Sequence, residues 1–455
     1  MTSNTKISDI RKYSDFCGFL SLIENLEIKS SIGWRFFANN VFITSKNLIV
    51  DELTNTQKTI SFLQNNKFDK DFQILDENFC EIADIERTIK NIAQNIVLND
   101  IELFEVKKFV LISEKIRLVT DNIKLIEFPD LSKVVKILDP ENTSMPTFYI
   151  YDVYSAELAL LRKRLKTEPS QDLQLQILEL EQEIRHSLSQ KLKPFAGNLL
   201  VALNNAACLD LLIAKAKFAL KYELCQPQIV ENETEYSQIF NPEIKETLET
   251  LGRKYQKIDI AFSDHPVLIT GINMGGKTLL LKTLALSQML CQYGFYVPAK
   301  TAKISLVAKV MFSFTDEQNQ KQGLSSFAAE MLNMNEIITQ ISENQNILVL
   351  IDELARTTNP KEGAAIVSAM LEILSEKQIK SFITTHYDIH NATCCRLRVK
   401  GFVDNIENIN PKNIEQFIDY QLIEDNSNKT PQQAFRIAEL LNINKILIEK
   451  AKKKL

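Results

Sequence analysis

The sequence is short of the features that mark secreted and membrane proteins. No apolar run in its 455 residues approaches the roughly 18 residues that span a bilayer, and the first residues lack the layout of a signal peptide. The seven cysteines are scattered without a CxxC pair, which argues against a disulfide framework or a zinc site. We expect a cytoplasmic protein without a membrane segment and with reduced thiols. The adjacent Cys394 and Cys395 leave open a redox or metal pair.

An excess of positive charge is also missing. Lysine and arginine number 53 against 58 acidic residues, which gives a net charge of -5. Proteins that bind nucleic acid usually carry a basic balance or a clustered basic face, so any DNA contact has to come from a local patch. One small patch could either touch phosphates or form a solvated helix end. It consists of Arg162, Lys163, Arg164 and Lys166.

The apolar content of 45% is enough for two or three cores, and the chain has two parts with different patterns. Residues 1–228 show helical periodicity. Apolar residues step by three or four from Leu173 to Leu188, with glutamine and glutamate between them, which predicts a long amphipathic helix. The first part therefore reads as an all-helical domain.

Short apolar runs separated by helical segments follow in residues 229–455. The runs at 267–270, 347–351 and 380–384 are typical of strands buried inside a helix-covered sheet. Alternation in residues 417–423 favours a half-exposed edge strand instead. Prolines and charges break the helical pattern between residues 226 and 240, where we place the boundary. The predicted fold class is α + α/β.

A glycine-rich loop lies between the first of these strands and a helix. Residues 271–278 read GINMGGKT and fit the G-x4-G-K-[ST] pattern, whose backbone N–H groups wrap phosphates. Three of only 11 glycines in the chain fall in this loop. Lys277 is predicted to reach the β- and γ-phosphates of ATP, and Thr278 to hold Mg²⁺. The candidate nucleotide-binding residues of the loop are Gly271, Asn273, Met274, Gly275, Gly276, Lys277 and Thr278.

Two acids end the strand at 347–351. Asp352 can hold Mg²⁺, and Glu353 can polarise the attacking water, although a strand end with solvated acids looks the same in isolation. His386 follows the strand at 380–384 and is one of four histidines. It is a candidate catalytic residue because of that position, while a lone histidine is more often an ordinary side chain. The predicted catalytic set is Glu353, His386 and Lys277.

Together these segments resemble the ATPase domain of the MutS family. The likeness is carried by GINMGGKT, by ILVLIDELARTTNPKEGAAI from residue 347 and by ITTHY from residue 383. Looser likeness reaches from about residue 25 to the C-terminus. The resemblance implies a helical core or lever domain, residues 1–228, followed by a P-loop ATPase domain of the ABC type, residues 229–455. The sheet of the latter is expected to be mixed and mostly parallel, with ATP and Mg²⁺ as ligands.

The stretch GLSSFAAEM, from residue 323, resembles a further MutS signature. In that signature a serine, here Ser325, reaches the nucleotide bound by the partner subunit; a helix cap by Ser325 or Ser326 is the local alternative. The resemblance thus implies a homodimer, or a heterodimer with a related subunit, whose ATP site is completed in trans. Symmetric pairs are also the commonest assembly.

The client of the ATPase remains open at this point. MutS-like proteins act on DNA, in mismatch repair or on branched or recombining strands. The chain begins almost at the core, and only about thirty residues stand where the family's DNA clamp is inserted, so little surface is expected for a duplex. Some short MutS-like proteins are associated with reactivating the cobalamin-dependent lysine 5,6-aminomutase. Because MutS-like proteins act on DNA, DNA is the predicted partner. A protein client is the alternative.

Overall fold

The computed structural model describes most of the chain: residues 5–10, 16–272, 275–313, 326–343, 346–390, 393–403, 417–425, 435, 438–439 and 443–453. It divides into two compact units. One comprises Met1–Asn25, Val41–Leu53 and Ala219–Leu455, and the other Leu26–Asn40 and Thr54–Phe218. The sequence-based division at residue 228 differs from this arrangement, because it places residues 1–25 and 41–53 with the helical part.

Backbone pairing explains why the N-terminal segments belong to the α/β unit. The N–H of Phe42 donates to the carbonyl of Thr5, and the N–H of Ile43 donates to the carbonyl of Gln292, at 2.8 Å. The hydroxyl of Tyr293 also donates to the carbonyl of Thr5, at 3.0 Å. Helices α1 (Ile7–Ile10) and α2 (Phe19–Ile23) lie in this unit. Such pairing between distant residues leaves no local pattern in the sequence.

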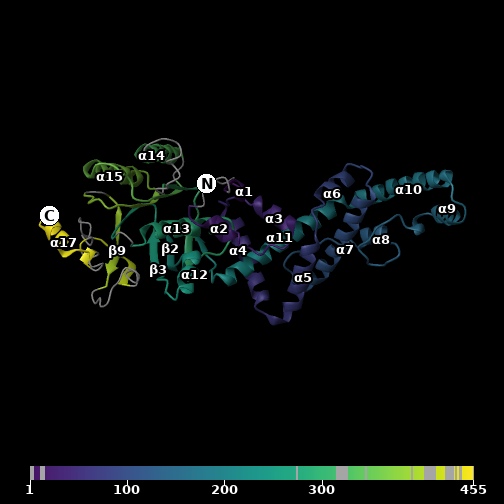
Figure 1. Ribbon diagram of the computed structural model, residues 1–455, viewed down its shortest axis with the longest axis horizontal. Helices are drawn as coiled ribbons and strands as arrows, with labels where there is room; N and C mark the ends of the chain where they lie inside the picture. The colour runs from purple at the N-terminus through teal and green to yellow at the C-terminus, as the bar shows by residue number, and fades with distance from the viewer. Residues whose placement is uncertain are drawn as a thin grey trace. The chain divides into compact units, whose positions relative to one another are not determined.

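The second unit is built of helices (Figure 1). Its helix α7 begins with a capping box, in which Asn99 and Glu102 satisfy each other's backbone N–H groups. Helices α4 (Lys46–Leu63) and α11 (Ala196–Lys221) each have residues in both units. The remaining helices are α3 (Ser31–Ala38), α5 (Asp69–Glu81), α6 (Glu86–Ala93), α7 (Asp100–Ile123), α8 (Ser132–Leu138), α9 (Ala156–Thr167) and α10 (Gln171–Leu192), with short 3-10 turns at Asn66–Phe68, Asp152–Tyr154 and Lys193–Phe195.

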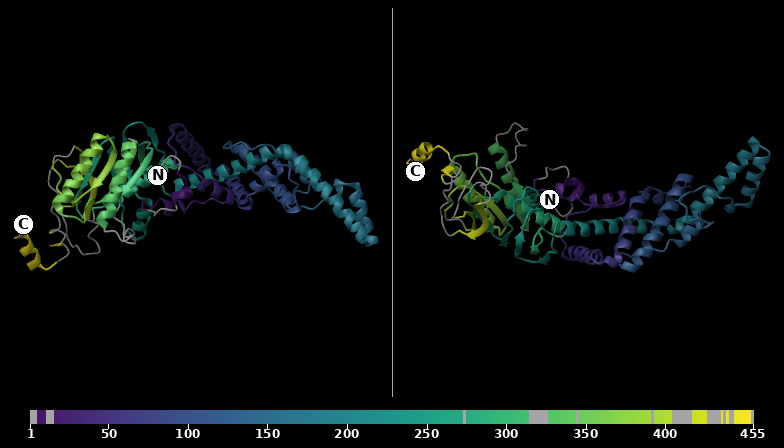
Figure 2. Two further views of the ribbon diagram at one scale, coloured as in Figure 1. Left: turned by 90° about the horizontal axis from the view of Figure 1, so that it is seen from above. Right: turned by 60° about the horizontal axis from the view of Figure 1, so that its bottom comes forward.

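The long amphipathic helix predicted from Leu173 to Leu188 is confirmed as α10. Ile177, Ile184 and Leu188 are buried, while Leu173 and Leu180 pack against the same core. Helices α9 and α10 run side by side as a hairpin (Figures 1 and 2), and Arg162 joins them through a 2.8 Å ion pair with Glu181.

One helical stretch among the described residues has the length and composition of a membrane span. It covers Gln171–Lys221, and 72% of its most apolar window is buried inside the protein. This stretch is an exception to the expectation that no apolar run comes near that length. Burial of this kind is also found in the core helices of globular proteins.

A buried ion pair lies inside the helical unit. The Nζ atom of Lys107, on α7, donates to Asp139 Oδ1 at 2.9 Å and to the hydroxyl of Tyr151 at 2.8 Å. The side chains of Lys107 and Asp139 are both fully buried. Asp139 also accepts from the Thr143 hydroxyl at 2.9 Å and from the Ser144 N–H at 2.8 Å. The cluster therefore ties the irregular segment after α8 to helix α7.

The α/β unit holds two sheets. The larger has the strand order β10-β9-β4-β8-β7-β6, in which every neighbouring pair is parallel except β10 with β9. The smaller has the order β1-β5-β2-β3. The strands of the larger sheet are β4 (Pro266–Thr270), β6 (Lys309–Ser313), β7 (Ile347–Ile351), β8 (Lys380–Thr384), β9 (Cys395–Phe402) and β10 (Ile418–Glu424), and those of the smaller are β1 (Gln228–Val230), β2 (Thr234–Ile239), β3 (Ile258–Phe262) and β5 (Thr301–Ser305).

The strand predictions agree with these sheets. Every residue of β4, β7 and β8 is buried, as expected for the interior of a helix-covered sheet. The predicted edge strand is β10, whose residues are mostly half-buried or exposed. The fold class is thus α + α/β, with a mixed, mostly parallel larger sheet.

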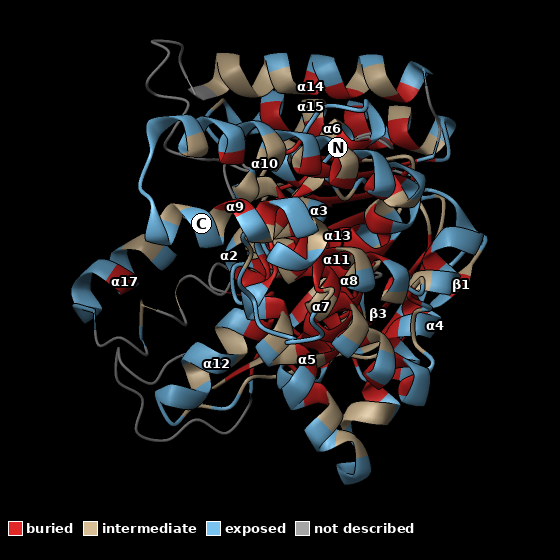
Figure 3. Ribbon diagram, turned by 90° about the vertical axis from the view of Figure 1, so that its right-hand side faces the viewer, coloured by how far each residue is buried: buried red, intermediate tan, exposed pale blue. Residues whose placement is uncertain are grey.

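Helices cover both faces of this sheet. Its strands β4, β7 and β8 are buried throughout, the class that Figure 3 draws in red. Helix α13 (Lys277–Gln292) contacts β7 and β8. Helices α14 (Ser326–Glu343) and α15 (Pro360–Glu376) share a core with β4, β7 and β8. The other described helices of this unit are α12 (Pro242–Thr250) and α17 (Lys445–Lys452). Parallel strands of this kind place their carboxyl ends at one edge, where ligands bind in open α/β sheets.

Candidate active site

The glycine-rich loop joins the end of β4 to the first turn of α13. Gly271 has φ of 132° and Gly276, the N-cap of α13, has φ of 73°, both in the region that favours glycine. A Cβ atom on Gly275 would lie 2.8 Å from the carbonyl oxygen of Ile272. Each of the three glycines is therefore required by the backbone. Asn273 and Met274, two further predicted loop residues, lie outside the described residues.

Lys277 is buried at the start of α13. Its Nζ atom donates to the carbonyl oxygens of Gly271, at 2.9 Å, and Ile272, at 3.0 Å. Burial lowers the pKa of this ammonium, while the nearby charges of Glu353 and Asp352 oppose the shift. The lysine is thus held against the loop by two backbone carbonyls.

Asp352 and Thr278 meet at the carboxyl edge of the sheet although 74 positions separate them. The Thr278 hydroxyl donates to Asp352 Oδ2 at 2.7 Å. The Thr384 hydroxyl donates to the other oxygen, Oδ1, at 2.6 Å. A carboxylate beside a hydroxyl offers the oxygen donors that Mg²⁺ prefers, so this pair fits the predicted metal ligands.

Glu353 and His386 also come together, as the sequence predicts for catalytic partners. A ring nitrogen of His386, Nε2, lies 2.5 Å from Glu353 Oε1, and Arg356 donates to Oε2 at 2.7 Å. The hydrogen bond from His386, with the charges of His386 and Arg356, lowers the pKa of Glu353 to about 2. Burial acts against this shift but is outweighed. Glu353 is therefore an ionised carboxylate at neutral pH.

Thr384 is a site residue that the sequence prediction missed. Besides holding Asp352, its hydroxyl accepts the backbone N–H of Glu353 at 2.8 Å. It therefore orients both strand-end acids from the neighbouring strand β8. The available signal was its place at the end of a buried strand, two residues before His386, but a threonine in a strand is too common to single out.

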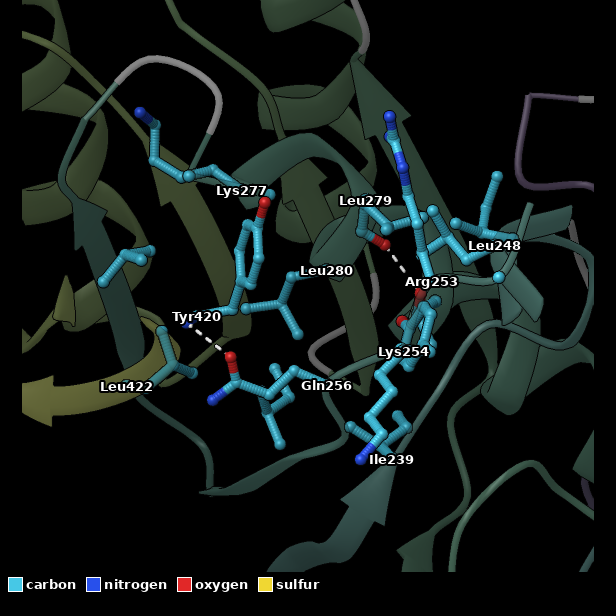
Figure 4. Close-up of a pocket in the computed structure, with 18 residues that line it drawn as sticks. Ile239, Leu248, Arg253, Lys254, Gln256, Lys277, Leu279, Leu280, Tyr420 and Leu422 are labelled. Carbon is cyan, nitrogen blue, oxygen red and sulfur yellow. Dashed lines mark hydrogen bonds between the residues drawn. The ribbon is translucent and has the colours of Figure 1, made fainter. Parts of the chain in front are cut away.

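A cavity of about 610 Å³ opens beside the loop. Gly275, Gly276 and Lys277 form one wall. Tyr420 and Leu422 from β10 lie on one side, and Leu248 and Arg253 on the other (Figure 4).

The side chain of Gln256 fastens β10 in place along this cavity. Its Oε1 accepts the N–H of Tyr420 at 3.0 Å, and its Nε2 donates to Asp419 at 2.7 Å. The Tyr420 ring lies so close to Gly276 that a Cβ atom there would be 3.2 Å from it. Sequence patterns did not find this cavity, because Val399, Tyr420 and Leu422 reach the loop from more than a hundred positions further along the chain.

Comparison with known proteins now bears on this geometry. The family model described as MutS domain V matches residues 267–455, which include the loop, both strand-end acids and His386. Residues 267–455 of this chain are therefore similar to domain V of the MutS family. The endonuclease MutS2 of Streptococcus pneumoniae, in the strains Hungary19A-6 and CGSP14, is 34% identical to it over 237 residues.

These MutS relatives are much longer than the matched region. The alignment covers 51% of this chain and 28% of each relative, so the chain spans less than a third of their length. The family signature residue Ser325 lies outside the described residues. The structure brings together Lys277, Thr278, Asp352, Glu353 and His386 at one edge of the sheet.

Proposed function

We propose that this chain is a MutS-like, Mg²⁺-dependent ATPase that couples ATP binding and hydrolysis to conformational change in a dimer acting on DNA. One observation carries the proposal. The loop lysine, the Thr278–Asp352 pair and the Glu353–His386 pair lie together at the carboxyl edge of a parallel sheet. Phosphoryl transfer needs this combination of a phosphate cradle, metal ligands and a water-activating carboxylate.

Each residue then has a role that its contacts support. The loop N–H groups and the N-terminus of α13 hold the phosphates of ATP, and Lys277 exchanges its two carbonyl partners for phosphate oxygens. Thr278 and Asp352 would hold Mg²⁺, and the ion would neutralise part of the phosphate charge. Glu353, kept ionised by His386, accepts the proton of the attacking water.

The adenosine part of ATP fits the cavity beside the loop. Its volume of about 610 Å³ lies within the usual range for small-molecule sites. Tyr420 offers an aromatic face next to Gly276, and the leucines at 248, 279, 280 and 422 provide apolar walls. We place the base and ribose here.

Two substitutions test the ATPase. Lys277→Ala should abolish nucleotide binding, because it removes the buried cation from the phosphate loop. Glu353→Gln should keep binding and slow hydrolysis by about 100- to 10,000-fold, since only proton transfer is lost. Binding of a fluorescent ATP analogue and phosphate release give the two readouts, with the exposed Lys361→Ala as control. Equal loss of binding in both variants would contradict these roles.

DNA is the proposed client, and the relatives reported above are named endonucleases, which favours a nucleic acid over a protein such as the aminomutase. Lys163, Arg164 and Lys166 are exposed on α9 and offer positive charge, whereas Arg162 is paired with Asp152 and Glu181. Hydrolysis and salt-dependent binding should be measured with homoduplex, mismatched and branched DNA. Unchanged rates and no binding with all three would remove DNA from the proposal.

The dimer and its location complete the proposal. We propose a cytoplasmic homodimer, or a heterodimer with a related subunit, in which Ser325 of one subunit reaches the nucleotide of its partner. Mixing Lys277→Ala with Ser325→Ala subunits tests this. If the site is completed in trans, one active site of the mixed dimer carries both substitutions and the other carries neither. The unaltered site should therefore restore part of the activity. Sedimentation as a monomer with ATP and full hydrolysis would contradict it.

A further inference from the structure

The turn that carries Glu353 has an unusual backbone. Glu353 has φ of 50° and Ala355 has φ of 60°, although neither is glycine. Residues with side chains rarely adopt this left-handed region, and they do so mainly where the surroundings impose it. Leu354 and Ala355 are almost completely buried, so the turn is enclosed by its neighbours. Its shape therefore depends on groups outside the turn.

Side chains from two other elements satisfy the backbone of Ala355. Its N–H donates to Glu330 Oε1, on α14, at 2.9 Å. Its carbonyl accepts the hydroxyl of Tyr387 at 2.6 Å. One bond is made by the N–H of Ala355 and the other by its carbonyl oxygen. Together they hold the peptide units next to Glu353 from α14 and from the segment after β8.

Tyr387 reaches this position only because α15 carries a glycine. A Cβ atom on Gly363 would lie 2.6 Å from two ring carbons and from the hydroxyl oxygen of Tyr387. Tyr387 is also the residue after His386, whose imidazole contacts Glu353. The segment after β8 thus holds the carboxylate of Glu353 through His386. It holds the turn through the next residue, Tyr387.

Glu330 is a half-buried acidic residue among apolar neighbours. Its neighbours on α14, including Phe327, Met331, Met334 and Ile337, pack into the apolar core that α14 and α15 share with the sheet. Burial raises the pKa of Glu330, and the N–H of Ala355 only partly offsets this shift. Burial of a carboxylate is costly, and Glu330 offsets part of this cost by accepting the backbone N–H of the turn.

We propose that Glu330 is a positioning residue, which fixes the water-activating Glu353 through the backbone of Ala355. Glu330 lies on helix α14, which starts at Ser326 directly after the signature serine. Because Glu330 holds the N–H of Ala355, a shift of α14 would change the position of Glu353. The position of α14 then controls hydrolysis without controlling nucleotide binding. This inference rests on the proposed ATPase function.

The test separates hydrolysis from binding in three variants. Glu330→Ala removes the acceptor of the Ala355 N–H, and misplacing a catalytic group by about 1 Å costs on the order of 100-fold in rate. We expect kcat to fall by about 10- to 100-fold, with the Kd for a fluorescent ATP analogue within about threefold of wild type. Glu330→Gln keeps an oxygen acceptor and should restore most of the rate. Glu336→Ala, an exposed glutamate on the same helix, is the matched control.

Hydrogen exchange gives a readout that does not need activity. The amide of Ala355 should exchange much faster in Glu330→Ala than in wild type, and slowly again in Glu330→Gln. A wild type that binds but does not hydrolyse ATP would refute the proposed function. If wild type hydrolyses ATP, three results would overturn the role of Glu330: unchanged kcat in the alanine variant, no rescue by glutamine, or loss of nucleotide binding together with kcat.

Discussion

The amide of Gln292 connects the end of the loop helix α13 to two other segments of the α/β unit, and its removal should be costly. Its Nε2 atom donates to the carbonyls of Ile43, at 2.9 Å, and Val307, at 2.8 Å. Its Oε1 atom accepts from Gln288 Nε2 at 2.7 Å and from the Val307 N–H at 3.2 Å. Gln292 is completely buried, so water cannot replace these partners.

The expected cost follows from these contacts. Gln292→Met keeps the length of the side chain and removes all four side-chain hydrogen bonds. At about 1 kcal/mol for each bond, the loss is about 4 kcal/mol. The buried thioether returns roughly 1 kcal/mol because it is more apolar than the amide. We therefore expect a net destabilisation of about 3 kcal/mol, or a fall in Tm of roughly 6 to 12 °C for a unit of this size.

Calorimetry of the full chain is the suitable assay. The one tryptophan, Trp34, belongs to the helical unit, so its fluorescence does not follow the α/β unit. Hydrogen exchange in residues 41–53 should rise as well, because the carbonyl of Ile43 loses its partner. Gln288→Met removes two bonds, to Gln292 and to Ser305, and should cost about 1 kcal/mol by the same arithmetic. The exposed Gln182→Met is the control.

Two results would refute this reasoning. A Gln292→Met variant with a Tm within about 2 °C of wild type would mean that the network contributes little, or that it rearranges without loss. Equal costs for the variants at 292 and 288 would mean that the number of lost hydrogen bonds does not set the destabilisation.

Two further predictions concern charge. Lys107→Met leaves Asp139 buried without its cation and should cost about 3 to 5 kcal/mol, measured by urea unfolding with Trp34 fluorescence; a cost below about 1 kcal/mol would contradict a buried ion pair. Glu353 has a pKa of about 2 in the folded chain, below its value in the unfolded chain, so the stability that it contributes is present above about pH 4.5 and is lost as the pH falls towards 2. The Tm difference between wild type and Glu353→Gln should accordingly shrink between pH 6 and pH 3, and a constant difference would contradict the ion-pair explanation.

Local pattern was sufficient for much of the fold and the core of the site. Runs apolar on both faces predicted β4, β7 and β8, because buried parallel strands need apolar side chains on both sides. The loop around Lys277 could be recognised because its glycines are required by backbone geometry within eight consecutive residues. The strand-end acids and His386 could then be placed, since parallel strands end at a common edge.

Tertiary structure alone decided the contacts that connect distant segments. Nothing local to residues 41–43 indicates that they pair with Thr5 and with the end of α13. Thr384 and Glu330 lie in stretches that resemble MutS motifs, but no local pattern indicates their contacts. These two residues and Tyr420 take their places at the site through the neighbours that packing brings to them. The helices, the strands and the chemistry of the glycine-rich loop could be predicted from the sequence, because they depend on local backbone geometry and on the spacing of apolar residues. Which side chains meet across strands and helices was decided by the fold, because those distances depend on the packing of the whole unit.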